Sequence, residues 1–522
     1  MTTRASTAAG RRLLLALAAA SVFTTPLAQA ADPTTRVIVA FKPGAAAPAR
    51  AAITAARGQV RLEIFGMDAV AVEVPTQALA GLARNPNIDY IEEDAKRYPL
   101  AATSPSTGVP YASGQLVPYG IPMVQADQLS DALAGNRKLC IIDSGYDRGH
   151  PDLSAGANVT GEYDSGTGWW YTDENHHGTH VAGTIAALNN AGTGVVGVNP
   201  NATLKLHIVK VFGAQAWAYS SSLTTAANKC KAAGANIISM SLGGSRSVKT
   251  EQRAFDSLYS AGILSIAAAG NAGTSALSYP AAYASVVSVA AIDENRNWAS
   301  FSQFNSDVEL AGPGVNVLST VPRGSGSASS LSVGSTVYAP GGMDGSPKLT
   351  ASGAVADFGL GGSAIAGSMS GKVCLIQRGT YDFATKVSNC QSSGGVAAVV
   401  YNNASGGFGG TLGTVVTSIP SVTASDSEGA AMQLQLGQSA TVAVSAIDYA
   451  YFDGTSMATP HVSAVAALVW SRNLGCTAAQ LRNSLNKSAL DLGTAGRDTK
   501  FGFGLVQARA ADDRIKSLGC GN

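Results

Sequence analysis

Residues 139–145 read Leu-Cys-Ile-Ile-Asp-Ser-Gly, a short apolar run that ends in a carboxylate and a turn. Four further apolar runs follow along the chain, at 204–211, 237–241, 263–269 and 286–290. Near-continuous apolar strands that alternate with helical stretches are typical of a parallel sheet covered on both faces. The sequence therefore predicts an α/β fold with a doubly wound parallel sheet, and ligands are expected beyond the carboxyl ends of its strands.

Composition and charge indicate a globular protein and exclude two classes of partner. The 522 residues are 46% hydrophobic and 13% charged, which is typical of a globular chain, and the length allows several domains. The net charge of +1 leaves no electrostatic footprint for a nucleic acid or an acidic membrane surface. We therefore expect neither of those partners.

The first 30 residues have the pattern of a secretory signal. Arginines precede an apolar run at 13–23, and Ala28-Gln29-Ala30 supplies a small-residue cleavage pattern. The run is too short to span a membrane, and no later apolar stretch is long enough. We expect a secreted, extracellular product that is cut after Ala30.

An even number of cysteines suits disulfide formation outside the cytoplasm. Six cysteines allow fifteen pairings. Proximity in the sequence favours Cys374 with Cys390 and Cys476 with Cys520, which leaves Cys140 with Cys230.

Two regions differ from the predicted parallel sheet. Residues 36–91 follow a strand–helix–strand–strand–helix–strand order, which predicts a small open-faced α+β sandwich. The segment 96–115 is rich in Pro, Ser, Thr and Gly, so a linker and a domain boundary are expected there. Residues 321–447 carry many Ser and Gly, with β-like runs at 372–377 and 396–401, and they are interpreted as a β-rich insert.

A histidine motif opens an apolar helix at 177–188. His177 and His180 can share a metal ion, or His177 alone can act as a base at the start of the helix. The Glu and the His-x-x-x-His spacing of a helical zinc motif are absent, which favours the base. Asp143 by itself is more typical of a turn than of a catalytic group.

A serine motif, Gly454 to His461, leads into a second apolar helix at 462–470. Thr455 or Ser456 can serve simply as the N-cap of that helix. Alternatively, Ser456 is a nucleophile at a helix N-terminus, where the helix dipole favours developing negative charge. The motif alone leaves both interpretations open.

Taken together, Asp143, His177 and Ser456 occur in the order Asp, His, Ser within one α/β region, and their windows resemble those of the subtilisin family of serine proteases. Residues 236–244 resemble the substrate-binding strand of that family, and 267–271 resemble the segment with its oxyanion asparagine. The resemblance covers nearly all of 115–320 and 448–510.

The resemblance implies a secreted serine endopeptidase that works through an acyl-enzyme. Ser456 would be the nucleophile, His177 the base and Asp143 its orienting partner, while Asn271 would donate to the oxyanion. A peptide would add as a strand against Ser241, Leu242, Gly243 and Gly244. The primary pocket would be walled by Ala268, Ala269 and Gly270, with Ser278 near its base.

The resemblance also implies a domain division. Residues 1–30 would be the signal peptide, and 31–116 a ferredoxin-like, inhibitor-type propeptide with its linker, whose tail would lie in the active-site cleft. Residues 117–522 would form the subtilisin-like peptidase domain, interrupted by an insert at 321–447. The insert resembles a protease-associated domain through 371–379 and 399–403.

No cofactor is expected for the chemistry, but the resemblance implies a structural calcium ion. Side-chain and backbone oxygens suit such a hard cation. The residues that match the ligand segments of the family are Gln115, Asp152, Leu188, Asn190, Thr193 and Val195. The loop at 191–194 is one residue longer than usual, and a turn without metal is the alternative.

The expected partners are protein or peptide substrates and the chain's own propeptide, with a monomer as the expected state. Two other functions remain open at this stage. One is a catalytically silent secreted binding protein that uses the insert. The other is peptide ligation, in which an amine rather than water accepts the acyl group.

Overall fold

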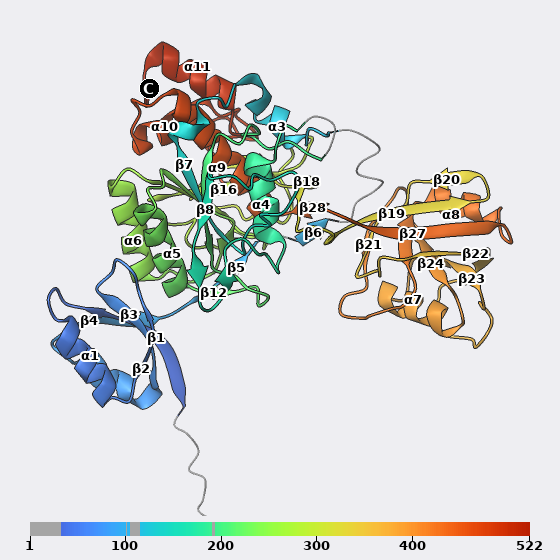
Figure 1. Ribbon diagram of the computed structural model, residues 1–522, viewed down its shortest axis with the longest axis horizontal. Coiled ribbons are helices and arrows are strands. Elements are labelled where there is room, and N and C mark those ends of the chain that lie inside the picture. Colours follow the sequence, from blue (N-terminus) through green and yellow to red (C-terminus); the bar gives the residue numbers. More distant parts are fainter. Residues whose placement is uncertain (1–32, 101, 105–114, 191–193) are drawn as a thin grey trace, which may run out of the picture.

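The structure is a computed structural model that describes residues 33–100, 102–104, 115–190 and 194–522. A small four-stranded sheet and two seven-stranded sheets form its main bodies (Figure 1). The expected signal peptide lies outside the described residues. Within the described part of the chain, no helix has the length and apolar character needed to cross a bilayer.

The first body is an antiparallel sheet with the strand order β2-β3-β1-β4. Alternating residues Val37, Val39 and Phe41 share one face of the sheet and pack with Ala49 and Ile53 of a helix. Its elements are β1 (Thr34–Phe41), α1 (Ala46–Ala55), β2 (Gln59–Glu63), β3 (Ala69–Pro75), the 3-10 turn η1 (Thr76–Ala78), α2 (Leu79–Ala83) and β4 (Ile88–Glu93). This order agrees with the sandwich expected from the sequence.

The central body is a parallel sheet with the strand order β17-β16-β15-β13-β7-β11-β8. Its strands are β7 (Lys138–Asp143), β8 (Val159–Gly161), β11 (Lys205–Lys210), β13 (Ile237–Met240), β15 (Leu264–Ala268), β16 (Val286–Ile292) and β17 (Val308–Pro313). The helices that accompany it are α3 (Gly120–Met123), α4 (His177–Ala186), α5 (Ser220–Ala232), α6 (Lys249–Ser260), α9 (Thr455–Arg472), α10 (Ala478–Ser488) and α11 (Ala508–Leu518), with short 3-10 turns η2 (Ala126–Gln128) and η3 (Ala134–Asn136).

Both faces of this sheet are covered, as β7 illustrates. Leu139 and Ile141 belong to the cluster that includes residues of α4 and α9, whereas Cys140 and Ile142 belong to the cluster that includes residues of α5 and α6. Successive side chains of a strand point to opposite faces, so the apolar run at 139–142 serves two cores at once. The predicted doubly wound α/β fold is therefore confirmed.

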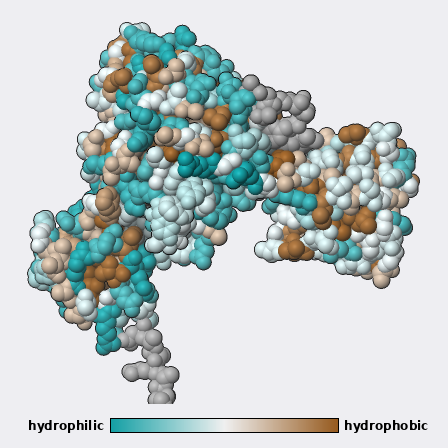
Figure 2. All heavy atoms as spheres, viewed as in Figure 1, coloured by the Kyte–Doolittle hydropathy of each residue, from teal (hydrophilic) through white to brown (hydrophobic). Residues whose placement is uncertain are grey.

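The third body is a mixed sheet with the strand order β20-β19-β27-β22-β23-β24-β26. Its elements are β19 (Gly326–Val333), β20 (Thr336–Tyr338), β22 (Thr350–Asp357), β23 (Lys372–Gln377), α7 (Phe383–Ser392), β24 (Ala397–Tyr401), β26 (Ser421–Ala424), α8 (Asp426–Gln433) and β27 (Ser439–Ile447), with a small pair formed by β21 (Met343–Asp344) and β25 (Gly410–Thr411). Exposed apolar side chains include Val337, Val416 and Leu434. Brown spheres gather on this body in Figure 2.

A two-stranded ribbon joins the third body to the central one. β18 (Val317–Thr320) pairs antiparallel with β28 (Tyr449–Asp453), and β19 pairs antiparallel with β27 immediately beyond them (Figure 1). The two segments by which the chain enters and leaves the third body therefore lie side by side.

Short strands occupy the segment for which a linker was expected. β5 (Lys96–Pro99) lies between β12 (Ala218–Tyr219) and β14 (Leu242–Gly243), and β6 (Ala102–Ser104) pairs with β28. The linker prediction misses these strands because their partners are distant in the sequence. One further hairpin is formed by β9 (Tyr163–Asp164) and β10 (Gly168–Trp169).

Three disulfides are present, Cys140–Cys230, Cys374–Cys390 and Cys476–Cys520. The second and third are the pairs that sequence proximity favoured, and the first is the pair that remained. The first joins β7 to α5, the second joins β23 to α7, and the third ties the segment after α9 to the residues after α11. Each restricts the unfolded chain and thereby stabilises the fold.

Candidate active site

Asp143 and His177 form a buried pair at the carboxyl edge of the central sheet. Asp143 is the last residue of β7, and His177 is the first residue of α4. The Asp143 carboxylate accepts from His177 Nδ1 at 2.7 Å and from the Ser144 N–H at 2.7 Å. Because the aspartate is fully buried and the histidine nearly so, the pair is shielded from solvent. This arrangement holds the imidazole with Nε2 directed away from the carboxylate.

Ser456 lies in the first turn of α9. The N-cap of this helix is Gly454, with no side-chain cap, so neither Thr455 nor Ser456 serves as the N-cap. The Ser456 hydroxyl donates to the Ser241 carbonyl at 2.7 Å. His177 Nε2 has no hydrogen-bond partner among the described residues. Proton transfer from Ser456 to His177 would therefore require rotation of the serine side chain.

The carbonyl oxygen of Leu100 lies at the centre of this site. Asn271 Nδ2 donates to it at 2.6 Å, and the Ser456 N–H donates to it at 3.3 Å. Thr455 orients Asn271, because the Asn271 Oδ1 accepts from the Thr455 N–H at 2.9 Å and from its hydroxyl at 2.8 Å. Sequence reasoning did not assign this role to Thr455, whose adjacency to Ser456 was the available signal. Two donors on one carbonyl oxygen can stabilise a developing oxyanion.

The residues before Leu100 bind as a strand. Pro99 pairs with Leu242, Tyr98 pairs with Gly243, and the Leu100 N–H donates to the Ser241 carbonyl at 3.3 Å. A Cβ atom at Gly244 would lie 2.5 Å from the Lys96 carbonyl oxygen, so only glycine permits this approach. The structure thus brings the four residues expected to bind substrate against a segment of the same chain.

A cavity of about 830 Å³ lies beside Leu100. Its lining includes Gly243, Gly244 and Ser278 from the expected set. Ala268, Ala269 and Gly270 are buried and do not line it. The lining also includes residues that sequence reasoning missed, among them Ala276, Leu277 and Gln303.

Beyond Leu100 the chain pairs with β28, the strand that leads to Ser456. Ala102 lies opposite Asp453, Thr103 opposite Phe452 and Ser104 opposite Tyr451. The segment is therefore anchored as a strand on both sides of Leu100.

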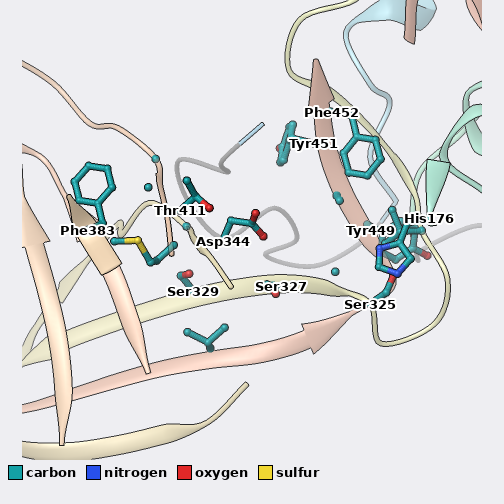
Figure 3. A pocket seen from close by; sticks show the side chains of 18 residues that line it. His176, Ser325, Ser327, Ser329, Asp344, Phe383, Thr411, Tyr449, Tyr451 and Phe452 are labelled. Atoms are coloured by element: carbon teal, nitrogen blue, oxygen red, sulfur yellow. The ribbon is translucent and has the colours of Figure 1, made fainter. Parts of the chain in front are cut away.

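A second cavity, of about 440 Å³, lies where the third body meets β28. Figure 3 shows His176 and Tyr449 at one side of it and Phe383 at the other, with Asp344 between them. Because Tyr451 and Phe452 also line it, this cavity continues from the strand that holds residues 102–104.

Carboxylates of the first body cap two helices of the central body. Asp94 accepts from the Ser221 N–H at 3.0 Å and from the Ser221 hydroxyl at 2.7 Å, at the start of α5. Glu92 accepts from the N–H groups of Lys249 and Thr250, at 2.7 and 2.9 Å, at the start of α6. Neither helix has a side-chain cap at its own N-cap residue, so the first body supplies the missing acceptors.

His180 does not join His177 in a shared site. Its Nε2 lies 3.0 Å from the Val317 carbonyl oxygen and 3.1 Å from that of Ala450, and its ring stacks on Phe452. Burial lowers the pKa of His180 to about 3, so the ring is neutral. The two histidines thus face different partners.

Three oxygen atoms of the expected calcium ligands converge on the side-chain amide nitrogen of Gln115. Gln115 Nε2 donates to the Leu188 carbonyl oxygen at 2.6 Å, to Asn190 Oδ1 at 3.2 Å and to the Val195 carbonyl oxygen at 3.3 Å. Asp152 adjoins the same cluster, since it accepts from Asn190 Nδ2 and from the Val195 N–H. Thr193 lies outside the described residues. The three oxygens around the Gln115 amide are of the kind that a calcium ion prefers as ligands.

The site brings together a serine, an Asp-oriented histidine and two donors to one carbonyl oxygen, an arrangement that can carry out acyl transfer. Comparisons with known proteins give the family. The model of the subtilase family matches residues 135–504. Because this match spans more than half of the chain, the protein belongs to the subtilase family.

Individual relatives agree with this assignment. The alkaline protease of Alkalihalobacillus alcalophilus is 40% identical over 258 residues, which are 48% of this chain and 62% of that protein. Subtilisin DY of Bacillus licheniformis is 42% identical over 217 residues, which are 40% of this chain and 76% of that protein. The first match thus spans less than two thirds of the relative's length.

A solved structure is also similar. It is the crystal structure of the psychrophilic subtilisin-like protease Apa1 from the Antarctic psychrotroph Pseudoalteromonas sp. AS-11. The sequence identity is 44% and the TM-score is 0.59, and the match covers 78% of this chain and all of that one. The similarity therefore extends beyond the sequence motifs to the fold.

Proposed function

We propose that this protein is a secreted serine endopeptidase made as a precursor, and that its first substrate is its own Leu100–Ala101 bond. The observation that carries the proposal is the Leu100 carbonyl oxygen, which accepts hydrogen bonds from both Asn271 Nδ2 and the Ser456 N–H. Strand pairing on both sides of Leu100 supports the same bond.

The chemistry assigns one role to each residue. The Ser456 oxygen attacks the Leu100 carbonyl carbon, and its proton moves to His177 Nε2 while Asp143 holds the imidazole in the required tautomer. The negative charge that forms on the carbonyl oxygen is stabilised by Asn271 and by the Ser456 N–H. The C–N bond then breaks as His177 returns the proton to the leaving amine. Water hydrolyses the resulting acyl-enzyme by the same steps in reverse.

The first body is proposed to act as the inhibitory propeptide. Its carboxylates Asp94 and Glu92 satisfy the N-termini of two helices of the central body, and its continuation at 96–100 fills the substrate strand position. Cleavage at Leu100 leaves these contacts intact, so the cut propeptide would stay bound and block the site. The proposed division is a signal peptide at 1–30, a propeptide and linker at 31–116 and a peptidase domain at 117–522, with the cleaved bond inside the second part.

The insert at 321–447 is proposed to act on the leaving-group side of the bond. Its strand β27 runs directly into β28, which pairs with residues 102–104 and lines the 440 Å³ cavity. Protein substrates with residues beyond the cleaved bond would meet this region. A monomer suffices for such a function, because both walls of the cleft come from one chain.

Intact mass, N-terminal sequencing and labelling with a fluorophosphonate test the proposal on the wild-type precursor and on Ser456→Ala. We expect the wild type to acquire an N-terminus at Ala101 and to label at Ser456, whereas the variant stays uncut and unlabelled. If both chains remain uncut and unlabelled, the peptidase proposal is wrong. If the wild type is cut at another bond and still labels, only the assignment of Leu100–Ala101 is wrong.

A structural calcium ion is proposed at the cluster of Gln115, Asp152, Leu188, Asn190 and Val195. The observation that supports it is the convergence of three oxygen atoms, from Leu188, Asn190 and Val195, on the side-chain amide of Gln115. When bound, the ion would tie the start of the central body to the segment after α4. Melting of Ser456→Ala with calcium and with a chelator tests this, because that variant cannot digest itself. We expect chelation to lower the melting temperature, and to have no effect once Asp152→Asn is added. An equal melting temperature with and without calcium would exclude the ion.

A further inference from the structure

Arg97 is the only cation of the segment 96–100 whose side chain is fully buried. It is the fourth residue before the proposed cleaved bond, when Leu100 is counted as the first. Its guanidinium lies inside the central body and forms an ion pair with Glu251 of α6, with Nη2 2.8 Å from Oε1. Neither side chain has any exposed surface. In contrast, Lys96 and Tyr98 on either side are exposed.

The pocket around Arg97 is built for a guanidinium. Besides the carboxylate, Nη2 donates to the Arg246 carbonyl oxygen at 3.0 Å. A Cβ atom at Gly244 would lie 3.1 Å from Nη1, so glycine leaves the path of the side chain open. Nη2 thus bonds to both a carboxylate and a backbone carbonyl, while Nη1 donates to the Lys96 carbonyl oxygen at 3.1 Å. Two nitrogens of the planar guanidinium are therefore engaged at once, which the single ammonium of lysine cannot reproduce.

Glu251 depends on this partner. Arg97 is its ion-pair partner, and its second oxygen, Oε2, is buried with no hydrogen-bond partner among the described residues. Burial raises the pKa of Glu251, and the guanidinium of Arg97 counteracts that shift. A buried carboxylate that loses its cation is strongly destabilised.

The other cations near α6 are engaged at the surface. Arg246 forms an ion pair with Glu93, and Arg253 forms one with Asp89. Lys249 lies over the ring of Tyr90. All three partners belong to the first body. None of them enters the pocket that Arg97 fills.

We propose that the Glu251 carboxylate lies at the bottom of an acidic subsite. This subsite selects substrates with an arginine at the fourth position before the cleaved bond, the position that Arg97 occupies in the precursor. The inference rests on the proposed peptidase function and specifies its substrate class. Once the cut propeptide leaves, the pocket retains the carboxylate, the Arg246 carbonyl and the opening at Gly244. A substrate that supplies a guanidinium restores every contact that Arg97 made, whereas an uncharged side chain leaves Glu251 buried and unpaired.

Internally quenched peptides test this on the mature wild-type enzyme. The parent peptide has the sequence of residues 96–103, Lys-Arg-Tyr-Pro-Leu-Ala-Ala-Thr, and its relatives carry lysine, alanine or glutamate in place of the arginine. We expect kcat/KM to fall about 100-fold from arginine to alanine, with lysine between them and glutamate lowest. Equal values for the arginine and alanine peptides would overturn the inference while leaving the peptidase function intact. No cleavage of any peptide, with no label on Ser456, would overturn both.

Variants of α6 locate the effect. Glu251→Gln should remove most of the preference for arginine, and Glu251→Leu should reverse it in favour of a leucine peptide. The matched control is Asp256→Asn, which removes a charge from the exposed side of the same helix and should keep the wild-type ratio. If Glu251→Gln keeps the full preference, the carboxylate does not select the substrate. The wild-type peptide comparison decides the question even if a Glu251 variant fails to fold.

Discussion

The segment 96–100 is held at its two ends by different kinds of contact. At Leu100 the contacts reach backbone atoms, because Asn271 and Ser456 donate to the carbonyl oxygen and Ser241 accepts from the N–H. At Arg97 the contact is made by a side chain, through a fully buried ion pair with Glu251. Contacts to backbone atoms are available to many residues, whereas the proposed pocket for Arg97 requires a cation. The two kinds of contact can therefore be altered one at a time.

Asp143→Asn should cause the largest loss of catalysis at Leu100. An asparagine can still accept from the Ser144 N–H, but its amide would face His177 Nδ1 and favour the wrong tautomer. We expect self-cleavage of the precursor to slow by about 10⁴-fold. The time course of precursor loss measures this. Asp127→Asn, at an exposed position, is the matched control and should cleave at the wild-type rate. An Asp143→Asn precursor that matures normally would contradict the assigned role.

Asn271→Ala weakens the same end without disturbing the Arg97 end. Loss of one oxyanion donor in a subtilisin-type site lowers turnover by about 10²- to 10³-fold. We expect that loss in kcat for the parent peptide, and an unchanged ratio between the arginine and alanine peptides. The kinetics of both peptides on one preparation provide the measurement. A changed ratio would show that the two ends are coupled.

Acid should destabilise the helix that carries Ser456. Burial lowers the pKa of His461 in α9 to about 4, whereas an unfolded histidine titrates near 6.5. Between these values the unfolded chain binds a proton that the folded chain does not. The contribution of His461 to the free energy of unfolding therefore falls by about 3 kcal/mol as the pH drops through that window, and is constant above it.

Denaturant unfolding of Ser456→Ala at pH 7.5 and at pH 4 measures this loss. Addition of His461→Asn should reduce the loss between the two pH values, because the titrating ring is gone. His180, which is buried in the same region, should retain its own share of the pH dependence. Equal losses with and without His461 would show that the ring does not carry the effect.

Gly244→Ala probes the point where the two ends meet. Its Cβ would lie 2.5 Å from the Lys96 carbonyl oxygen and 3.1 Å from Arg97 Nη1. We expect kcat/KM to fall about tenfold for the parent peptide, an overpacking effect of modest size. A truncated peptide that begins at Tyr98 should be cleaved as by the wild type, because it lacks both clashing groups. Equal losses for both peptides would place the damage in the fold instead.

The resemblance found in the sequence and the structure agree on the family and on the parallel sheet. Asp143, His177 and Ser456 could be singled out because each occupies a local signature, at the end of an apolar strand or at the start of an apolar helix. Those signatures depend only on neighbouring residues. The N-cap interpretation of Thr455 and Ser456 was wrong, because Gly454 takes that position and Thr455 instead orients Asn271.

Other parts of the site could not be predicted from local patterns. The Pro- and Ser-rich composition at 96–115 indicated a linker, yet 96–99 and 102–104 are strands because they pair with Leu242 and with β28, far along the chain. The walls of the cavity beside Leu100 likewise include Gln303 rather than Ala268. Which residues meet in a cleft depends on loops whose course follows from packing.

The sequence by itself determined the fold class and the four residues proposed for the chemistry, because strand periodicity and helix starts are properties of short segments. Only the tertiary structure decided which peptide bond lies in the site and which side chain fills the buried pocket beside it. Arg97 and Glu251 are 154 residues apart, and each alone has the pattern of an ordinary surface charge. They form a buried ion pair only because folding removes both side chains from water and places them in contact with each other.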